Sequence, residues 1–217
     1  MSNIKLDNKI IELLKNLFNL KQSLDLYKLI SLNAGEINKK AGKTFFVHAQ
    51  SLALNTFVLD ICKIFEEENR YKLNSIPAII NFIQSGKVKP KHPDIIETYI
   101  TKHKEKVIEK FYYAVPLKLI LKKFKDKNKN HLSEFKRFRD SKAAHAEDIS
   151  ITKINSLPSY DTMEKFLFFA IDFYSIIYEA YIDGVPVDIK TDKRVFVSLS
   201  AILNKVGLQN IKKDFDD

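Results

Sequence analysis

Apolar residues recur every three or four positions along most of this chain, the spacing that places them on one face of a helix. The pattern predicts two amphipathic helices near the N-terminus, over about 10–18 and 24–30. A longer apolar pattern begins near Phe45 and ends in the acidic run 66–68. The periodicity therefore predicts helix almost throughout the chain.

Proline and polar residues divide the middle of the chain. Ser75 and Pro77 predict the start of a short helix, because a proline in the first turn lacks an N–H group that would be unbonded anyway. A helix is predicted from Asp94, disturbed at Pro116 and resuming directly after it. The polar residues 125–130 predict a break before the next helix.

Three further helices are predicted in the last third. The first carries Phe135 and Phe138 inward and ends near position 145. The second starts at Tyr160 with Ser159 as its N-cap, runs to about 182, and is apolar on most faces. The last ends at Gly207, since glycine commonly terminates helices.

Composition supports an all-α fold of long antiparallel helices with short connections, because glycine (5) and proline (6) are few. No internal repeat or long linker divides the chain, so residues 1–217 are predicted to form a single domain. No stretch approaches the roughly 20 apolar residues of a membrane span, and no signal peptide is recognisable. Cys62 is the only cysteine, so no intrachain disulfide can form, which favours a cytoplasmic location.

Positive charge is concentrated in one region. Residues 86–142 contain 17 Lys and Arg against 7 Asp and Glu, whereas the rest of the chain contains 19 against 20. Such a basic region favours a polyanionic partner such as RNA. The alternative, a solvated lysine-rich face, accounts for the charge equally well.

Arginine is rare in this chain, and two of its four arginines, Arg137 and Arg139, lie at the end of the basic region. Arg139 is followed by Asp140 and, six residues later, by His145. A guanidinium is suited to gripping phosphate, and a histidine is suited to moving protons near neutral pH. RNA can be cut without a metal ion when its 2′-hydroxyl attacks the adjacent phosphate. That reaction needs a proton acceptor, a proton donor and a cation.

Geometry restricts this hypothesis. Six residues of continuous helix separate Arg139 and His145 by about 9 Å of rise and about 120° of rotation. The two side chains can converge if the helix ends near Ala144, or if two chains contribute across a symmetry axis. Lys142, three residues from each, lies on the ridge between them.

The Arg139–Asp140–His145 spacing resembles the signature of the HEPN superfamily, in which four to six residues separate an arginine from a histidine. The wider pattern resembles HEPN proteins of the type U bacterial abortive-infection system. The shared features are the apolar helix with an acidic end, the serine-initiated helix at Ser75, and the Pro-Ser-Tyr-Asp helix start at 158–161. The resemblance covers about 45–85 and 130–205, which predicts a core there and a basic helical insertion at 86–130.

The resemblance implies an all-α HEPN bundle that forms a homodimer with the motif at its interface, and a metal-independent endoribonuclease without a cofactor. Arg139 and His145 are then the catalytic residues, and Asp140 orients them. Lys136, Arg137 and Lys142 are predicted to hold the RNA backbone. The resemblance also implies a role in phage defence or as a toxin, with an antitoxin or another defence protein as a possible partner.

Simpler interpretations stand beside these. Arg139 could form a surface ion pair with Asp140 or Glu134, and His145 could serve the dipole at a helix C-terminus. His131 and Glu134 share a helix face but lack a third metal ligand at a recognisable spacing. Two other function classes stay open: a non-catalytic HEPN module that binds RNA or protein, and a helical interaction protein.

Overall fold

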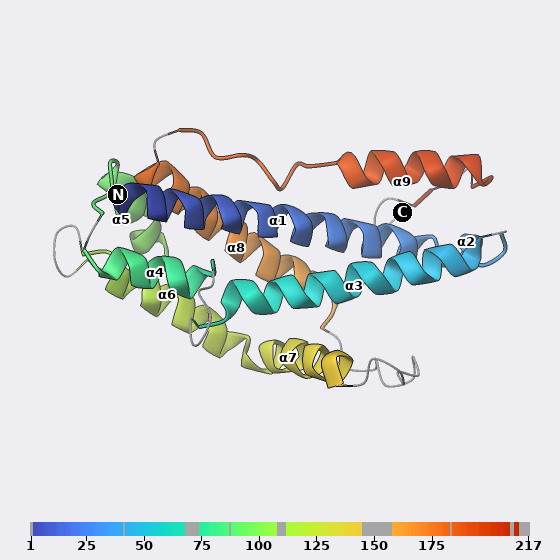
Figure 1. Cartoon of the computed structure of the whole chain (residues 1–217), viewed down its shortest axis with the longest axis horizontal. Helices are drawn as coiled ribbons and strands as arrows, with labels where there is room; N and C mark the ends of the chain where they lie inside the picture. The colour runs from blue at the N-terminus through green and yellow to red at the C-terminus, as the bar shows by residue number, and fades with distance from the viewer. Residues whose placement is uncertain are drawn as a thin grey trace.

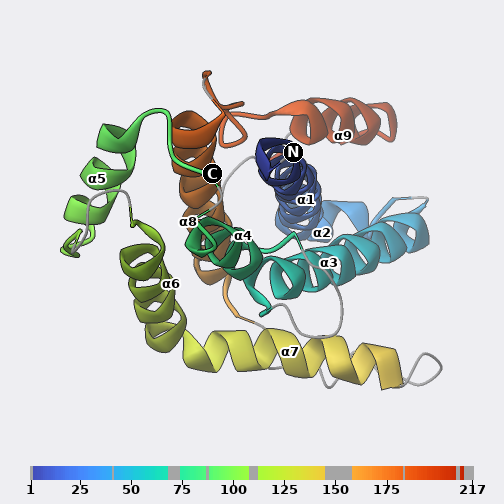
Figure 2. The same ribbon diagram turned by 60° about the vertical axis from the view of Figure 1, so that its left-hand side comes forward.

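The computed structural model describes residues 2–40, 42–67, 74–86, 88–107, 112–144, 158–182, 184–208 and 211–212. Within these ranges every regular element is a helix, which confirms the predicted all-α class (Figure 1). The helices are α1 (Ser2–Leu32), α2 (Ala34–Ile37), α3 (Lys43–Phe65), α4 (Ile76–Gln84), α5 (Pro93–Lys102), α6 (Ala114–Lys127), α7 (Lys129–Ala144), α8 (Tyr160–Tyr181) and α9 (Arg194–Lys205). The long helices α1, α3 and α8 lie side by side, with α7 on one side of the bundle and α9 on the other (Figures 1 and 2).

Helix α1 is one continuous element of 31 residues, so the prediction of two separate helices was wrong. Its fully buried residues alternate at spacings of four and three: Leu6, Ile10, Leu13, Leu17, Leu20 and Leu24. That spacing keeps a single apolar seam facing α3 and α8. No glycine or proline lies between positions 18 and 24, so nothing interrupts the helix where a break was expected.

The helix predicted from Asp94 also differs from the structure, which places two helices there. Lys104 adopts a left-handed conformation with φ of 58°. The N–H of Lys104 bonds to the carbonyl of Thr101, and the N–H of Glu105 bonds to that of Ile100. This Schellman arrangement ends α5. Pro116 therefore lies in the first turn of a new helix, where it breaks no hydrogen bond.

Other predicted boundaries are confirmed. Ser75 accepts a hydrogen bond from the N–H of Ala78 at 3.2 Å, and Ser159 accepts one from that of Thr162 at 3.4 Å. Gly207 follows α9 with φ of 87°, a conformation that favours glycine. The predicted polar break at 125–130 is shorter than expected, because α6 continues to Lys127 and only Asn128 separates it from α7.

The main core extends beyond the two stretches predicted for it. It includes the seam of α1 and, within 86–130, buried residues such as Ile96, Tyr113 and Leu117. The basic charges of this region lie on the outer faces of α5 and α6, while their inner faces pack against α8 and α4. Helices α5 and α6 are therefore part of the packed bundle.

A second, smaller apolar cluster joins α9 to the far end of α1 and α3. It includes Leu199 and Leu203 of α9, with Leu29, Ile30 and Phe46 opposite. The buried amide of Asn33 also pairs with the backbone of Lys212, donating to its carbonyl at 3.1 Å and accepting from its N–H at 2.9 Å. The C-terminal part of the described chain is thereby held against the end of α1.

Helix α3 is long and apolar enough, by length and composition alone, to cross a membrane. This corrects the expectation that no stretch approaches a membrane span. Ten of its residues are buried in the bundle, between α1 and α7. Core packing is the common reason for such a composition.

Phe135 offers a test of the packing that holds α7. Its ring is fully buried and lies 6.0 Å from the ring of Phe57 and 5.4 Å from that of Phe166. Phe135→Ala is expected to lower the free energy of unfolding by about 3–5 kcal/mol, because it leaves a cavity between three helices. The control Phe168→Ala removes a ring that is 37% exposed and should cost far less. Urea unfolding followed by circular dichroism would contradict this interpretation if the two losses were equal.

Candidate functional site

Helix α7 positions the predicted site residues through its buried aromatic face. Phe135 fixes the helix against α3 and α8, as described above. Arg139 lies four residues later, on the same face of α7, and so projects toward the C-terminal end of α3. Lys136 and Arg137 are exposed on the outer side of the helix.

Two carboxylates hold the guanidinium of Arg139. Its Nε donates to Oδ1 of Asp140 at 2.9 Å, and its Nη1 donates to Oε2 of Glu66 at 3.4 Å. The Arg139 side chain is 26% exposed, whereas the Asp140 side chain is largely exposed. Arg139 therefore lies at the rim of the bundle, with its charge directed partly inward and partly to solvent.

Glu66 is a site residue that the sequence interpretation did not assign. It follows the last residue of α3, where the backbone becomes extended (ψ 140°) and turns the side chain toward α7. The signal available in the sequence was the acidic run at 66–68. Nothing in that run indicated that its partner would be Arg139, which is 73 positions away.

The surroundings of Arg139 keep it charged. Partial burial acts to lower the pKa of Arg139, but the hydrogen bond to Asp140 and the charges around it outweigh burial and raise that pKa. Burial raises the pKa of the nearby Cys62 thiol to about 11, with Arg139 opposing the shift. The thiol is therefore neutral at physiological pH and is not a nucleophile here.

The structure brings together some of the predicted residues. Arg139 and Asp140 are in contact, and Glu134 pairs instead with His131, at 3.1 Å between Oε2 and Nδ1. His145 lies outside the described residues, and of Lys142 only the helical backbone is described. The relation of Arg139 to His145 is therefore still a prediction.

A basic surface, here meaning the outer faces of α6 and α7, adjoins Arg139. The two helices follow one another around one edge of the molecule (Figure 2). Its exposed cations are Lys118, Lys122, Lys123, Lys127, Lys129, Lys136 and Arg137. Some are neutralised within the chain, as in the pair between Lys123 and Glu105 at 2.5 Å. The five lysines of α6 nevertheless face only one acidic residue on that helix, Asp126, so the surface is positive overall.

Whether the described residues could hold a metal ion depends on how closely their His, Cys, Asp and Glu side chains are grouped. No three or more His, Cys, Asp or Glu side chains in this part of the chain are grouped closely enough to hold an ion. His131 and Glu134, which share one face of α7, contact each other.

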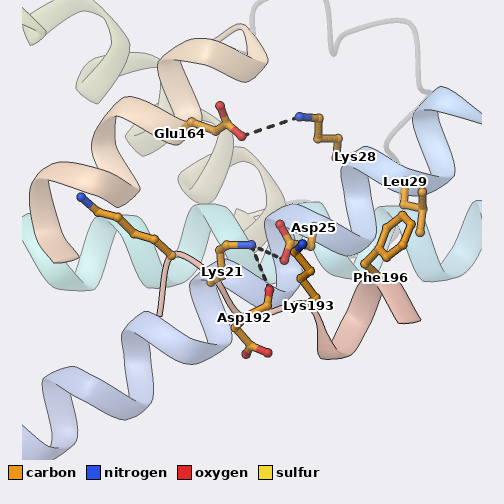
Figure 3. Close-up of a pocket in the computed structure, with 9 residues that line it drawn as sticks. Lys21, Asp25, Lys28, Leu29, Glu164, Asp192, Lys193 and Phe196 are labelled. Carbon is orange, nitrogen blue, oxygen red and sulfur yellow. Dashed lines mark hydrogen bonds and ion pairs between the residues drawn. The ribbon is translucent and has the colours of Figure 1, made fainter. Parts of the chain in front are cut away.

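A cavity of about 480 Å³ lies away from α7, between α1, α8 and the segment leading into α9 (Figure 3). Its charged side chains are largely paired with one another. Lys28 contacts Glu164 at 3.8 Å, and Lys21 bonds to Asp25 and to the carbonyl of Asp192. Burial raises the pKa of Asp25, although pairing with Lys21 opposes the shift. These pairs hold α1, α8 and the segment before α9 together, so the charged residues that line the cavity have a structural role.

The described residues thus form an all-α bundle in which two carboxylates hold Arg139 near the end of α7. The family model HEPN_AbiU2, described as AbiU2, matches residues 4–195, and the chain therefore belongs to this family. The match spans α1 to the start of α9 and includes the basic region 86–130. Comparisons with curated proteins and with solved structures gave no match.

The ion pair between Asp192 and Arg194, at the start of α9, predicts that stability depends on pH. Asp192 accepts hydrogen bonds from the N–H of Arg194 at 3.1 Å and from its guanidinium at 2.9 Å. The guanidinium hydrogen bond is the main reason why the pKa of Asp192 falls to about 2. Because this pKa is depressed on folding, the stability it contributes is present above about pH 4, near the unfolded value, and is lost toward pH 2.

Asp192→Asn keeps an oxygen that can accept from the N–H of Arg194 but removes the charge, so it should lower the free energy of unfolding at pH 7 and match the wild type near pH 2. Asp192→Ala also removes this acceptor and should cost about 1 kcal/mol more at every pH, the usual net contribution of one hydrogen bond. Urea titrations between pH 2 and 7 at fixed ionic strength measure both differences. An Asn variant with the same deficit at both ends of this range would show that the charge is irrelevant.

Proposed function

We propose that this chain is a metal-independent endoribonuclease that acts as a homodimer in phage defence or as a toxin. Membership of the HEPN AbiU2 family supports an RNA-directed or defence-related role. The observation that carries the proposal is the permanently charged Arg139, fixed by Asp140 and Glu66 at the rim of the bundle beside the basic surface. An antitoxin or another defence protein would be its partner in the cell.

The proposed reaction is attack of the RNA 2′-hydroxyl on the adjacent phosphate. His145 removes the proton from the hydroxyl or supplies one to the departing 5′-oxygen, and Arg139 stabilises the charge on the pentavalent phosphate. Asp140 accepts a hydrogen bond from Nε of Arg139 and so fixes the direction of the guanidinium. DNA lacks the 2′-hydroxyl, which makes this chemistry selective for RNA.

The basic surface supplies the attraction that the site itself lacks. Arg139 with Asp140 and Glu66 carries a net charge of about −1, which by itself does not attract phosphate. Lys136 and Arg137 on the adjoining turn of α7, with Lys142 three residues beyond Arg139, are proposed to hold the neighbouring phosphates. The lysines of α6 extend this attraction along the RNA.

Cleavage of RNA by the purified chain in EDTA tests the proposal directly. Wild type is expected to produce 2′,3′-cyclic phosphate ends, whereas Arg139→Ala and His145→Ala should each lose at least about 100-fold in rate, the usual contribution of such groups. His131→Ala, which changes a histidine on the same helix, should retain activity.

Arg139→Lys adds a second control, because it keeps the charge but loses the planar fork, and it should lie between wild type and Arg139→Ala. RNA binding without cleavage by a folded wild type would instead support a non-catalytic binding module. Equal cleavage by wild type and His145→Ala would remove histidine from the mechanism.

Neutralising Glu66 is predicted to strengthen RNA binding. Its contact with Arg139 is long, at 3.4 Å, and partly exposed, so a phosphate can displace it. Glu66→Gln removes a negative charge about 6 Å from the phosphate, worth about 0.7 kcal/mol in water. RNA affinity should therefore rise about threefold, as measured by filter binding or fluorescence anisotropy.

The matched control is Glu12→Gln, which alters an exposed glutamate of α1 and should leave affinity unchanged. If Glu66→Gln instead weakens binding as Arg139→Ala does, Glu66 positions the guanidinium and does not compete with phosphate.

A further inference from the structure

An apolar groove runs beside α1, between α3 and α9, which lie on either side of that helix (Figures 1 and 2). Its volume is about 320 Å³, and all three helices contribute to it. The lining includes Leu26 and Ile30 of α1, Phe45 and Ala49 of α3, and Leu199 and Ile202 of α9. This groove, here called the α9 groove, lies over the smaller apolar cluster that joins α9 to the bundle.

The α9 groove is open to solvent along its edges. Phe45 is 63% exposed and Ile202 is 46% exposed, although both line the groove. Ile30 and Leu199, deeper in the same groove, are buried. A closed apolar floor with exposed apolar edges is typical of a surface that binds a partner.

The dimensions of the α9 groove fit a helix. Its lining positions on α9 run from Arg194 to Ile202, which is about 12 Å of helix, or about two turns. An amphipathic helix presents apolar side chains at i, i+3 or i+4, and i+7, which span nearly the same length. Laying such a face into an apolar groove between helices is a common mode of peptide recognition.

Charge around the α9 groove favours an acidic partner. Helix α9 contains no acidic residue, and neither does α3 from Lys43 to Leu59. Lys43 and Lys205 are exposed at one end of the groove, and neither forms an ion pair with another described residue. Lys40 lies at the same end, since its Nζ is 3.4 Å from the position that a Cβ at Gly207 would take. Acidic side chains would therefore meet positive charge here and no like charge on either wall.

The opposite end of the α9 groove is neutral. Its cation, Arg194, pairs with Asp192 at 2.7 Å between Nη2 and Oδ2. The uncompensated positive charge is thus confined to the end beside Lys43 and Lys205. A partner helix is expected to carry its acidic residues at one of its two ends.

We propose that the α9 groove docks an amphipathic helix of another protein, with its apolar side chains between α3 and α9 and its acidic side chains beside Lys43 and Lys205. Phe45 lies near the start of α3 and Glu66 follows its end, so about 30 Å of helix separates the groove from the contact with Arg139. The docked helix therefore leaves Arg139 accessible, and it would recruit the chain without blocking it. Only this last step rests on the proposed function.

Selection from a display library of helical peptides on the immobilised wild-type chain tests the docking site. Enriched peptides are expected to carry apolar residues at i, i+3 or i+4, and i+7, with Asp or Glu at one end. Binding of the most enriched peptide, synthesised with a fluorescent label, is then measured by anisotropy. Phe45→Glu and Ile202→Glu should each weaken it at least about 10-fold, as expected when a charge replaces an apolar contact at the centre of an interface. Lys43→Glu and Lys205→Glu should each weaken it about threefold at low salt, and high salt should abolish that difference.

Matched controls lie on the same two helices. Val197 of α9 is 62% exposed, close to the value for Phe45, and Leu59 of α3 is 44% exposed, close to that for Ile202. Neither control residue lines the α9 groove, so Val197→Glu and Leu59→Glu should bind the peptide as the wild type does. All four side chains are exposed, so the variants should keep the wild-type melting temperature, which separates lost binding from lost folding.

The docking site is overturned if no peptide is enriched, or if the enriched peptides bind the Phe45→Glu protein as tightly as the wild type. Two other occupants would also overturn it. Loss of self-association in the Phe45→Glu protein, measured by sedimentation, would assign the α9 groove to a second copy. Loss of binding to phosphatidylglycerol vesicles in the same variant would assign the groove to a lipid surface.

The docking site and the ribonuclease fail separately. A wild type that binds the peptide but cleaves no RNA removes the ribonuclease and leaves the docking site. Cleavage of RNA should be unchanged when the peptide is saturating, because the α9 groove is distant from Arg139. Inhibition by the peptide would overturn the conclusion that the docked helix leaves Arg139 accessible.

Discussion

The site depends on a cluster of stacked and edge-to-face phenylalanines that joins four helices. Phe166 of α8 lies at the centre, with ring distances of 5.4 Å to Phe65 of α3, 5.1 Å to Phe124 of α6 and 5.4 Å to Phe135 of α7. Phe65 and Phe124 also stack on each other at 5.6 Å. Aromatic pairs of this kind add specific geometry to the burial of apolar surface. The cluster fixes the crossing of α7 over α3, and that crossing brings Arg139 to Glu66.

The contacts of Arg139 orient its guanidinium but do not attract a polyanion. Two carboxylates fix the guanidinium, and they also cancel its charge. The free energy that brings a polyanion to this place would have to come from the lysines of α6 and α7, most of which are exposed. Such an attraction acts over distances of about the Debye length and weakens with salt, while the fixed guanidinium acts only on contact.

Helix α3 has two apolar faces with different consequences. One face is buried against α1 and α7, and the other carries Phe45, Leu52 and Leu59, which are exposed. The same helix thus contributes to the core and contacts the candidate site through Glu66, the residue after its C-terminus.

The sequence alone determined the helical class, most of the helix ends and the chemical interest of Arg139. These depend on local physics: apolar spacing, serine caps at Ser75 and Ser159, and the left-handed conformation that Gly207 accepts. The local pattern predicted the wrong helix boundaries where tertiary packing determines them. Examples are the continuity of α1 and the Schellman ending of α5 at Lys104. Glu66 as the partner of Arg139 was also beyond the sequence, because a contact between residues 73 positions apart depends on how α7 crosses α3. That crossing is set by the shapes of many side chains acting together, which no short stretch of the chain encodes.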